Sequence, residues 1–328
     1  KPMVALSALE NKIIDENFKV NCTGKIEMYG QTYHCWKKRG HGIVDLKSAM
    51  KQSCDTYFYE IARKLGVDRL KETSIKFGLG EKVLNETFSI EKKGLIPDTK
   101  WKKNNLGKGW VIGETLITGI GQGYTQTTPL QLCLMTAQLA NGGFKIYPKI
   151  IVEEDGKTSE EIRIIMNENR KKLYKKDSGL KDTTEDLLGF LDKKEHETLF
   201  KSSKNINLVR EAMFASTNEI RGTSYKSRID DPKYQFAGKT GTSQVKRITE
   251  AARELDLSTS EIPYNERDHA LYIAFGPYKN PRYALSIVIE HGGSGSSAAA
   301  PIAKKLFKLI IDRHELREKQ TKQNDLKI

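Results

Sequence analysis

Apolar residues recur at helical spacing in four parts of the chain. Residues 45–65 show it most clearly, because their apolar side chains fall on one face of a helix (Leu46, Ala49, Met50, Tyr57, Phe58, Ile61 and Leu65). Residues 1–10 and 298–311 are also predicted as helices. A further helix is predicted over residues 130–140, with Thr128 as its cap, Pro129 in its first turn, and Asn141-Gly142-Gly143 ending it.

Three runs have the composition of strands, namely residues 234–245, 270–277 and 283–290. Short loops between them would make the sheet antiparallel. Residues 17–44 contain several glycines and are predicted as a loop or hairpin region.

Residues 153–207 differ from the rest, being rich in Lys, Glu and Asp and poor in aromatics. We predict a charged, partly helical surface insertion there, with the core resuming at residues 209–214. The tail from residue 312 is polar, and we expect it to be frayed. The predicted organisation is one domain over residues 1–311 with an insertion at about 153–207, followed by a polar tail over 312–328.

The 328 residues are 38% hydrophobic and 30% charged, a composition typical of a soluble globular protein. The net charge of +13 suits a protein beside an anionic wall polymer or membrane, and also a lysine-rich proteome. No basic helix with interleaved aromatics is present, so we predict no nucleic-acid partner. The chain has no run of about 18 apolar residues and no signal peptide. It begins with Lys1-Pro2, and we expect it to be the C-terminal part of a longer polypeptide.

The run Phe236–Val245 contains the motif Lys239-Thr240-Gly241-Thr242. Lys-Thr-Gly is one of three motifs of the serine acyltransferases that react with penicillin. A tripeptide this short also occurs by chance, so it needs the support of the other two motifs.

A second motif of this kind is Ser53-Cys54-Asp55, near the middle of the helical stretch 45–65. Ser53 and Asp55 can both face a cleft if the helix breaks there. Ser53 could then relay a proton, and Asp55 could hold a lysine or a substrate amide. The alternative is a polar helix break with a local side-chain cap.

Further stretches keep a characteristic order along the chain. They are residues 40–46 (GHGIVDL), 113–115 (GET), 119–124 (GIGQGY), 128–132 (TPLQL), 222–223 (GT), 290–293 (EHGG) and 299–303 (AAPIA). With the two motifs, they make the chain similar to the transpeptidase domain of class B penicillin-binding proteins of the elongation-specific type. The resemblance covers residues 1–151 and 208–311.

The resemblance implies that Lys1 is the lysine of a Ser-x-x-Lys motif, since it precedes a proline and a small apolar helix. Serine and lysine at i and i+3 share one helix face, and a neutral lysine can take the serine proton. Lys239 is a candidate for the second cation that would lower the pKa of Lys1. The nucleophilic serine would lie three residues before Lys1, so this chain alone is expected to be inert.

The implied fold is α/β, the penicillin-recognising serine transpeptidase and β-lactamase-like fold: an antiparallel sheet flanked by helices, plus a helical lobe, with the cleft between. In the implied reaction, the serine attacks a D-Ala-D-Ala bond and a neighbouring amine resolves the acyl-enzyme. The roles implied are general base for Lys1, proton management for Ser53 and Asp55, carboxylate binding for Lys239 and Thr240, close peptide approach at Gly241, and an oxyanion-hole N–H from Thr242.

A second site is predicted from cysteine spacing. Cys22, Cys35, His41 and Cys54 follow the pattern C-x12-C-x5-H-x12-C, a Cys3His set of the kind that binds Zn²⁺ tetrahedrally, although the spacing is not that of a zinc finger. The resemblance also implies a structural zinc ion beside the active site. A Cys22–Cys35 disulfide with Cys54 buried and free, or three free thiols, are the alternatives. Cys133 is predicted as a core residue, and His34 is a weaker alternative ligand.

Two other functions stay open at this point. A β-lactamase would need a dedicated deacylating base, and none is identifiable; a β-lactam sensor or scaffold would bind the drug without cross-linking. The partners implied by the resemblance are peptidoglycan stem peptides, β-lactams and a glycosyltransferase of the elongation machinery. The resemblance also implies an N-terminal anchor outside this chain, which would place the domain in the periplasm at the bacterial inner membrane.

Overall fold

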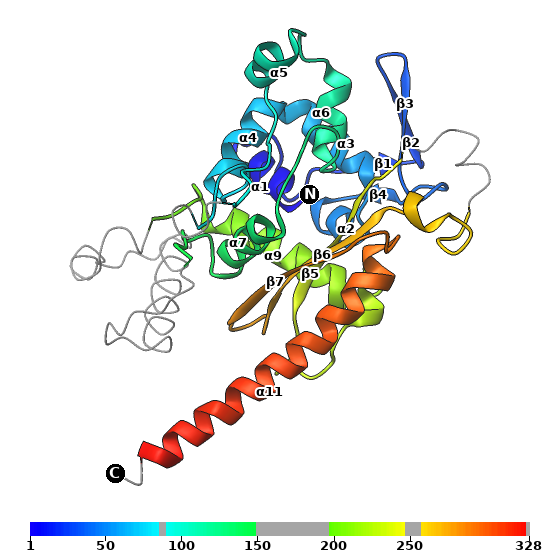
Figure 1. Ribbon diagram of the computed structural model, residues 1–328. Helices are drawn as coiled ribbons and strands as arrows, with labels where there is room; N and C mark the ends of the chain where they lie inside the picture. Colours follow the sequence, from blue (N-terminus) through cyan, green and yellow to red (C-terminus); the bar gives the residue numbers. More distant parts are fainter. Residues whose placement is uncertain (85–89, 149–196, 247–256, 326–328) are drawn as a thin grey trace. The chain divides into compact units, whose positions relative to one another are not determined.

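The structure is a computed structural model that describes residues 1–84, 90–148, 197–246 and 257–325 (Figure 1). Its internal contacts divide the chain into two compact units, Lys1–Ala212 and Met213–Ile328, where the sequence analysis predicted one domain. The boundary falls within helix α9 (Ser203–Asn218). Among the described residues, no helix has the length and hydropathy needed to cross a bilayer.

The first unit is built around helix α1 (Pro2–Glu10), whose nine residues are all buried. It packs on α3 (Asp55–Leu65) and α4 (Val67–Lys76). On the α4 side, Thr73 donates to the Ser7 hydroxyl at 2.8 Å, which satisfies polar groups inside the contact. Further helices among the described residues of this unit are α2 (Leu46–Lys51), α5 (Thr99–Leu106), α6 (Ile112–Gly119) and α7 (Pro129–Ala140).

The predicted helix over residues 45–65 is broken in the middle. Such a break is what Ser53 and Asp55 need if both are to face the same side. α2 ends at Lys51 and α3 begins at Asp55. Between them, Ser53 has a φ of 55°, in the left-handed region, and Cys54 is extended. The predicted cap of α7 is confirmed, because the Thr128 hydroxyl accepts from the backbone N–H of Gln131 at 3.2 Å.

The predicted hairpin region forms two antiparallel pairs. Strand β1 (Val20–Cys22) pairs with β4 (Gly42–Val44), and β2 (Lys25–Met28) pairs with β3 (Gln31–His34). Gly40 is required where the segments cross, because a Cβ there would lie 2.1 Å from the backbone oxygen of Cys22. This crossing holds the segment after β3 close to the end of β1.

Most of the predicted insertion, residues 153–196, lies outside the described residues. The remainder, residues 197–207, belongs to the first unit and packs against it, and the end of the insertion at about residue 207 stays a prediction. Thr198 bridges to Phe144, and Ile206, in the first turn of α9, is completely buried. The carboxylate of Glu10 accepts from the N–H of Lys201 and from the Asn205 amide. The charged composition of this segment predicted an exposed location, whereas its polar groups find a partner in Glu10, which is distant in the sequence.

The second unit contains an antiparallel sheet in the order β5-β6-β7, as predicted. Its strands are β5 (Ala237–Ser243), β6 (His269–Gly276) and β7 (Tyr283–Ile289). A π-helical turn, η5 (Gly295–Ala299), leads into helix α11 (Ala300–Asp325). The unit also has two short 3-10 turns, η3 (Tyr225–Ser227) and η4 (Tyr264–Glu266). Phe307 of α11 stacks on Phe236 with ring centroids 4.8 Å apart, at the centre of the core of this unit.

The predicted end of the last helix at Ile311, and the frayed tail after it, are wrong, because α11 continues to Asp325. Polar contacts extend the helix past the core. Lys233 forms ion pairs with Asp312 at 3.1 Å and with Glu315 at 2.8 Å, so the turn after Ile311 is held against the body of the unit.

Candidate active site and thiol cluster

The residues predicted to act in catalysis fall into two groups, one in each unit. In the first unit, Lys1 lies at the start of α1 and its Nζ donates to two side chains. The acceptors are Oδ1 of Asp55 at 2.6 Å and Oγ of Ser53 at 2.9 Å. The side chains of Lys1 and Asp55 are each 12% exposed. The structure therefore brings the ammonium, the hydroxyl and the carboxylate together in a largely buried site.

The break between α2 and α3 creates this arrangement. The left-handed Ser53 turns the chain so that Ser53 and Asp55 both reach Lys1, while Cys54 between them contacts other thiols. Asp55 is also the first residue of α3, where a carboxylate interacts favourably with the helix dipole.

Trp36 is a site residue that the sequence analysis missed. Its backbone N–H donates to Oδ2 of Asp55 at 2.9 Å, while Lys1 donates to Oδ1, so each carboxylate oxygen has its own donor. Its indole N–H reaches the backbone oxygens of Gln52 and Ser53 at 3.0 and 3.1 Å. A tryptophan in a glycine-rich segment has no motif to reveal it, although it directly follows the predicted ligand Cys35.

The four predicted metal ligands form one cluster beside this site. The ligand atoms of Cys22, Cys35, His41 and Cys54 all lie within 4.8 Å of one another. Nδ1 of His41 is 3.6 Å from the sulfur of Cys22 and 3.6 Å from that of Cys35. A tetrahedral zinc ion with ordinary Zn–S and Zn–N bonds sets S···N separations of about 3.5 Å, so the residues fit that ion. His34 is not part of the cluster.

All four cysteines of the chain are free thiols in the structure, so the Cys22–Cys35 disulfide is not formed. Cys22, Cys35 and Cys54 are buried, whereas Cys133 is only partly buried in α7. Three sulfurs and an imidazole in a largely apolar setting need a shared proton or a cation to balance any thiolate charge.

Mutual contacts perturb the acid–base properties of the cluster. The hydrogen bond from Cys54 lowers the pKa of Cys35 to about 2, and the same contact raises the pKa of the Cys54 thiol. Burial opposes ionisation of Cys22, but hydrogen bonds with Thr56 and His41 leave its pKa below the ordinary value. Burial likewise works against protonation of His41, but its contacts with Cys35 and Cys22 raise its pKa overall. The contacts thus favour thiolates at Cys35 and Cys22 beside a positive charge on His41, and a neutral thiol at Cys54.

In the second unit, Lys239 of β5 is 3% exposed and its Nζ donates to the Thr240 backbone oxygen at 3.0 Å and hydroxyl at 3.2 Å. The Thr240 hydroxyl in turn donates to the Thr223 hydroxyl at 3.0 Å. Thr223 belongs to the stretch 222–223, for which no role was predicted. Within the part of the chain that the structure describes, β5 is an edge strand. An edge strand can pair with an extended peptide, which suits a peptide substrate.

Glycines let neighbouring segments approach β5 closely. A Cβ at Gly238 would lie 2.2 Å from the Tyr272 hydroxyl, and a Cβ at Gly295 would lie 2.7 Å from the Gly241 backbone oxygen. Gly241 itself lies opposite Leu271, and Thr242 lies opposite Ala270. Two close approaches, on β5 and in η5, therefore require glycine around the Lys-Thr-Gly strand.

A buried hydroxyl network supports β5 from the neighbouring strand. The Tyr272 hydroxyl lies 2.9 Å from that of Thr217 and 3.0 Å from that of Ser224. Complete burial raises the pKa of Tyr272 to about 12, so the group is a neutral phenol at physiological pH.

Comparison with known proteins assigns the chain to a family. Residues 1–308 match the family described as "Penicillin binding protein transpeptidase domain". The chain is 35% identical over 318 residues to peptidoglycan D,D-transpeptidase MrdA of Salmonella typhimurium strain LT2, with 95% of this chain and 45% of the relative covered. The corresponding protein of Acinetobacter baumannii is 33% identical over 309 residues, covering 94% of this chain and 41% of the relative. The chain thus spans somewhat less than half the length of these relatives.

Solved structures agree with this assignment. Pseudomonas aeruginosa PBP2 in complex with WCK 5153 has a TM-score of 0.72 and 33% identity, covering 94% of this chain and 59% of that one. PBP2 of Helicobacter pylori, in a complex with MreC, has a TM-score of 0.69 and 28% identity, covering 96% of this chain and 48% of that one. With 308 of its residues matched by the family, this chain is a member of the penicillin binding protein transpeptidase domains.

Proposed function

We propose that the protein containing this chain is a peptidoglycan D,D-transpeptidase that cross-links stem peptides through a serine acyl-enzyme during cell-wall elongation. The observation that carries the proposal is the contact of Lys1 Nζ with both Ser53 and Asp55, together with the buried lysine of the Lys239-Thr240-Gly241-Thr242 strand. The relatives with the same domain are named D,D-transpeptidases, which favours this reaction over that of a β-lactamase.

The proposed nucleophile is a serine three residues before Lys1 in the longer protein. Lys1, in its neutral form, takes the serine proton as the oxygen attacks the carbonyl carbon of the D-Ala-D-Ala bond. The tetrahedral intermediate collapses, the bond to the terminal D-Ala breaks, and its nitrogen receives the proton. An amine of a second stem peptide then attacks the ester, which forms the cross-link and returns the proton to the serine.

The remaining residues are assigned by the contacts they make. Ser53, 2.9 Å from Lys1, can pass the proton between the lysine and the leaving or entering nitrogen. Asp55 orients the lysine. Lys239 and Thr240 supply a cation and a hydroxyl for the terminal carboxylate of the substrate, and the backbone N–H of Thr242 contributes to the oxyanion hole.

We further propose that Cys22, Cys35, His41 and Cys54 hold a structural Zn²⁺ ion. The S···N separations of 3.6 Å support this, as does the contact-driven lowering of the pKa of Cys35 to about 2, since zinc binds thiolates. When bound, the ion would supply positive charge that stabilises the thiolates. Holding these ligands would also fix the positions of Ser53, Asp55 and Trp36. Cys54 lies between Ser53 and Asp55, and Cys35 directly precedes Trp36.

The proposed partners follow from the same assignment. They are stem peptides as donor and acceptor, β-lactams as acylating inhibitors, and a glycosyltransferase of the elongation machinery. The complex of the Helicobacter pylori relative with MreC supports an elongation assembly. We propose an N-terminal membrane anchor in the longer protein and a periplasmic location for this domain.

The test uses the full-length protein, a variant in which the serine three residues before Lys1 is replaced by alanine, and the 328-residue chain alone. Each is incubated with a fluorescent penicillin. Stable label is expected on the full-length protein only, and absence of label there would refute the serine acyl-enzyme.

Two further readouts separate the alternatives. Rapid loss of label would indicate a β-lactamase. Stable label without any cross-linked product, when the protein is given a donor stem peptide and an acceptor amine, would indicate a sensor.

A further inference from the structure

Helix α11 carries a second apolar surface in addition to the one that it buries. Its buried residues Ala303, Phe307 and Ile311 pack into the core of the second unit. Three other apolar residues stand exposed at intervals of seven: Ile302 at 37%, Leu309 at 63% and Leu316 at 57%. Seven residues make almost two helical turns, so these three side chains form one row along the helix.

Cations flank this row. At 100° per residue, Arg313 and Arg317 lie along one side of the row and Lys305 lies along the other. The two acidic residues of this stretch whose side chains the structure describes, Asp312 and Glu315, are both paired with Lys233. Arg313 has no ion pair with any residue that the structure describes. The exposed row is thus apolar in the middle and positive at its edges.

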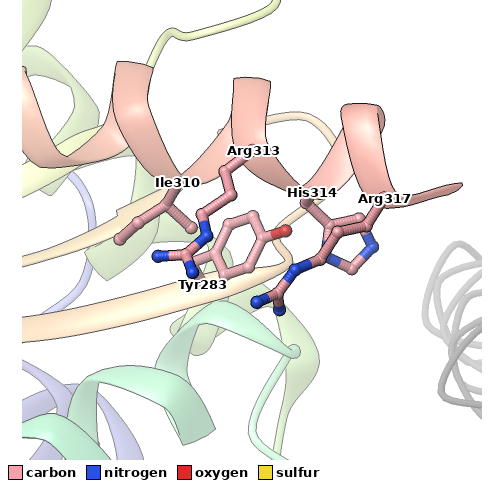
Figure 2. Close-up of a pocket in the computed structure, with 5 residues that line it drawn as sticks. All are labelled: Tyr283, Ile310, Arg313, His314 and Arg317. Carbon is pink, nitrogen blue, oxygen red and sulfur yellow. The ribbon is translucent and has the colours of Figure 1, made fainter. Parts of the chain in front are cut away.

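On the arginine side, the surface opens into a hollow between α11 and β7, shown in Figure 2. The hollow has a volume of about 240 Å³ and is lined by Tyr283, Ile310, Arg313, His314 and Arg317. The rings of Tyr283 and His314 meet edge-on at 5.9 Å. Tyr283 and Ile310 give the hollow an apolar floor, and the two arginines give it a cationic rim. We name the row and this hollow together the α11 outer face.

We propose that the α11 outer face docks an acidic amphipathic helix of a partner protein. The apolar row of the partner would pack along Ile302, Leu309 and Leu316. Glutamate or aspartate side chains beside that row would pair with Arg313 and Arg317, where a planar guanidinium can hold a carboxylate through two hydrogen bonds. A large apolar side chain of the partner would fill the hollow over Tyr283.

The charges select this occupant over a second copy of the chain. In a symmetric pair, Arg313, Arg317 and Lys305 of one copy would meet the same cations of the other, and like charges suppress association. The hollow further favours a structured partner, because a side chain on a rigid helix can fill a defined cavity and act as the anchor of an interface.

The first test measures binding of a synthetic peptide to the full-length protein by fluorescence anisotropy. The peptide has about 21 residues, with leucines at heptad spacing flanked by glutamates. Saturable binding that weakens with salt is expected, and a peptide with lysine in place of each glutamate should not bind. An acidic peptide that fails to bind would overturn the proposal.

Matched variants locate the binding. Arg313→Glu/Arg317→Glu and Leu309→Ala/Leu316→Ala should each weaken binding about tenfold or more. Lys100→Glu/Lys103→Glu, on α5 of the other unit, carries the same charge change and should not. Acylation by fluorescent penicillin should be the same in all of them, which separates this surface from the proposed active site. Equal binding by the wild-type protein and the Arg313/Arg317 variant would contradict the assignment.

A second test identifies the natural occupant. A photoreactive phenylalanine analogue at position 309 of the full-length protein is activated in living cells, and the cross-linked residues are found by mass spectrometry. A protein segment with an apolar heptad row flanked by acidic residues would support the proposal. Cross-links to lipid, to a second copy, or to a basic segment would overturn it, and vesicles containing phosphatidylglycerol would then serve to measure membrane binding directly.

Discussion

Lys1 and Asp55 are 54 positions apart in the sequence, yet Nζ of Lys1 lies 2.6 Å from Oδ1 of Asp55. The second carboxylate oxygen is occupied by the backbone N–H of Trp36 at 2.9 Å. Asp55 therefore has no freedom to rotate without breaking a contact. The lysine is held by a fixed acceptor on one side and by the Ser53 hydroxyl on the other.

Replacing Asp55 by asparagine should impair acylation without unfolding the protein. Asparagine keeps the shape but offers only one acceptor oxygen, so it cannot accept from both Lys1 and Trp36. We expect the rate of acylation of the full-length protein by fluorescent penicillin to fall about 100-fold. Asp230→Asn removes a carboxylate that is 82% exposed and should have no effect. An Asp55→Asn variant that acylates at the normal rate would remove Asp55 from the mechanism.

The zinc proposal predicts a metal content that depends on three of the four cysteines. Wild-type protein purified without chelator should contain about one zinc per chain. Cys35→Ser and Cys54→Ser should each lose most of it and melt at a lower temperature, because a metal bound only by the folded state stabilises that state. Cys133→Ser, outside the cluster, provides the matched control. Wild-type protein without zinc, or serine variants that keep it, would be inconsistent with the proposal.

Gly238 should not tolerate a side chain. A Cβ at this position would lie 2.2 Å from the hydroxyl and 2.5 Å from Cζ of Tyr272, which is completely buried and bonded to two other hydroxyls. We expect Gly238→Ala to cost about 2 kcal/mol or more of unfolding free energy. Gly109→Ala, where no heavy atom outside the adjacent residues lies within 4 Å of the added Cβ, should change stability little. Urea denaturation measures the unfolding free energy of both variants. A Gly238→Ala midpoint equal to that of the wild type would show that β5 can shift away from Tyr272.

Asp98 should make the protein sensitive to acid. Burial tends to raise the pKa of this carboxyl, but the ion pair with Lys71 at 2.7 Å and the N–H of Trp101 outweigh it and lower the pKa overall. Because the folded state then binds the proton less tightly than the unfolded state, the stabilisation is present above about pH 4 and is lost as the pH falls through the lowered pKa.

The measurement is the free energy of unfolding between about pH 2 and 6. Asp98→Asn should be less stable than wild type at the upper end and should show a shallower loss toward the lower end. Glu27→Gln, at a carboxylate that is 69% exposed, should follow the wild-type curve. Parallel curves for Asp98→Asn and wild type would show that this carboxyl does not contribute.

Local signals in the sequence were sufficient for several helices and strands. The cap at Thr128 and the three strands depend on residues a few positions apart, and each is present in the structure. The break at Ser53 was only a condition for the Ser53-Cys54-Asp55 motif, because the apolar spacing predicted one helix through residues 45–65. The spacing of Cys22, Cys35, His41 and Cys54 likewise identified a set whose ligand atoms lie within 4.8 Å of one another.

Contacts between distant residues could not be predicted in this way. Trp36 reaches Asp55 because β1 and β3, of two separate strand pairs, pack on α3, and no nearby residue signals that contact. The charged composition of residues 153–207 predicted a surface segment, but the backbone N–H of Lys201 is bonded to the buried carboxylate of Glu10. The continuation of α11 depends on Lys233, 79 positions before Asp312. In each case the contact joins residues that are far apart in the sequence.

The complete burial of α1 restricts how this domain can change. An ordinary amphipathic helix has a solvent-exposed face on which substitutions are tolerated, but all nine residues of Pro2–Glu10 are buried. A saturation mutagenesis scan should therefore find an unbroken block of intolerant positions there, without the usual periodicity of three to four. Substitutions, including those that confer resistance to an inhibitor, would have to accumulate outside this helix. An inhibitor that contacts the segment beginning at Lys1 should therefore be harder to evade by mutation.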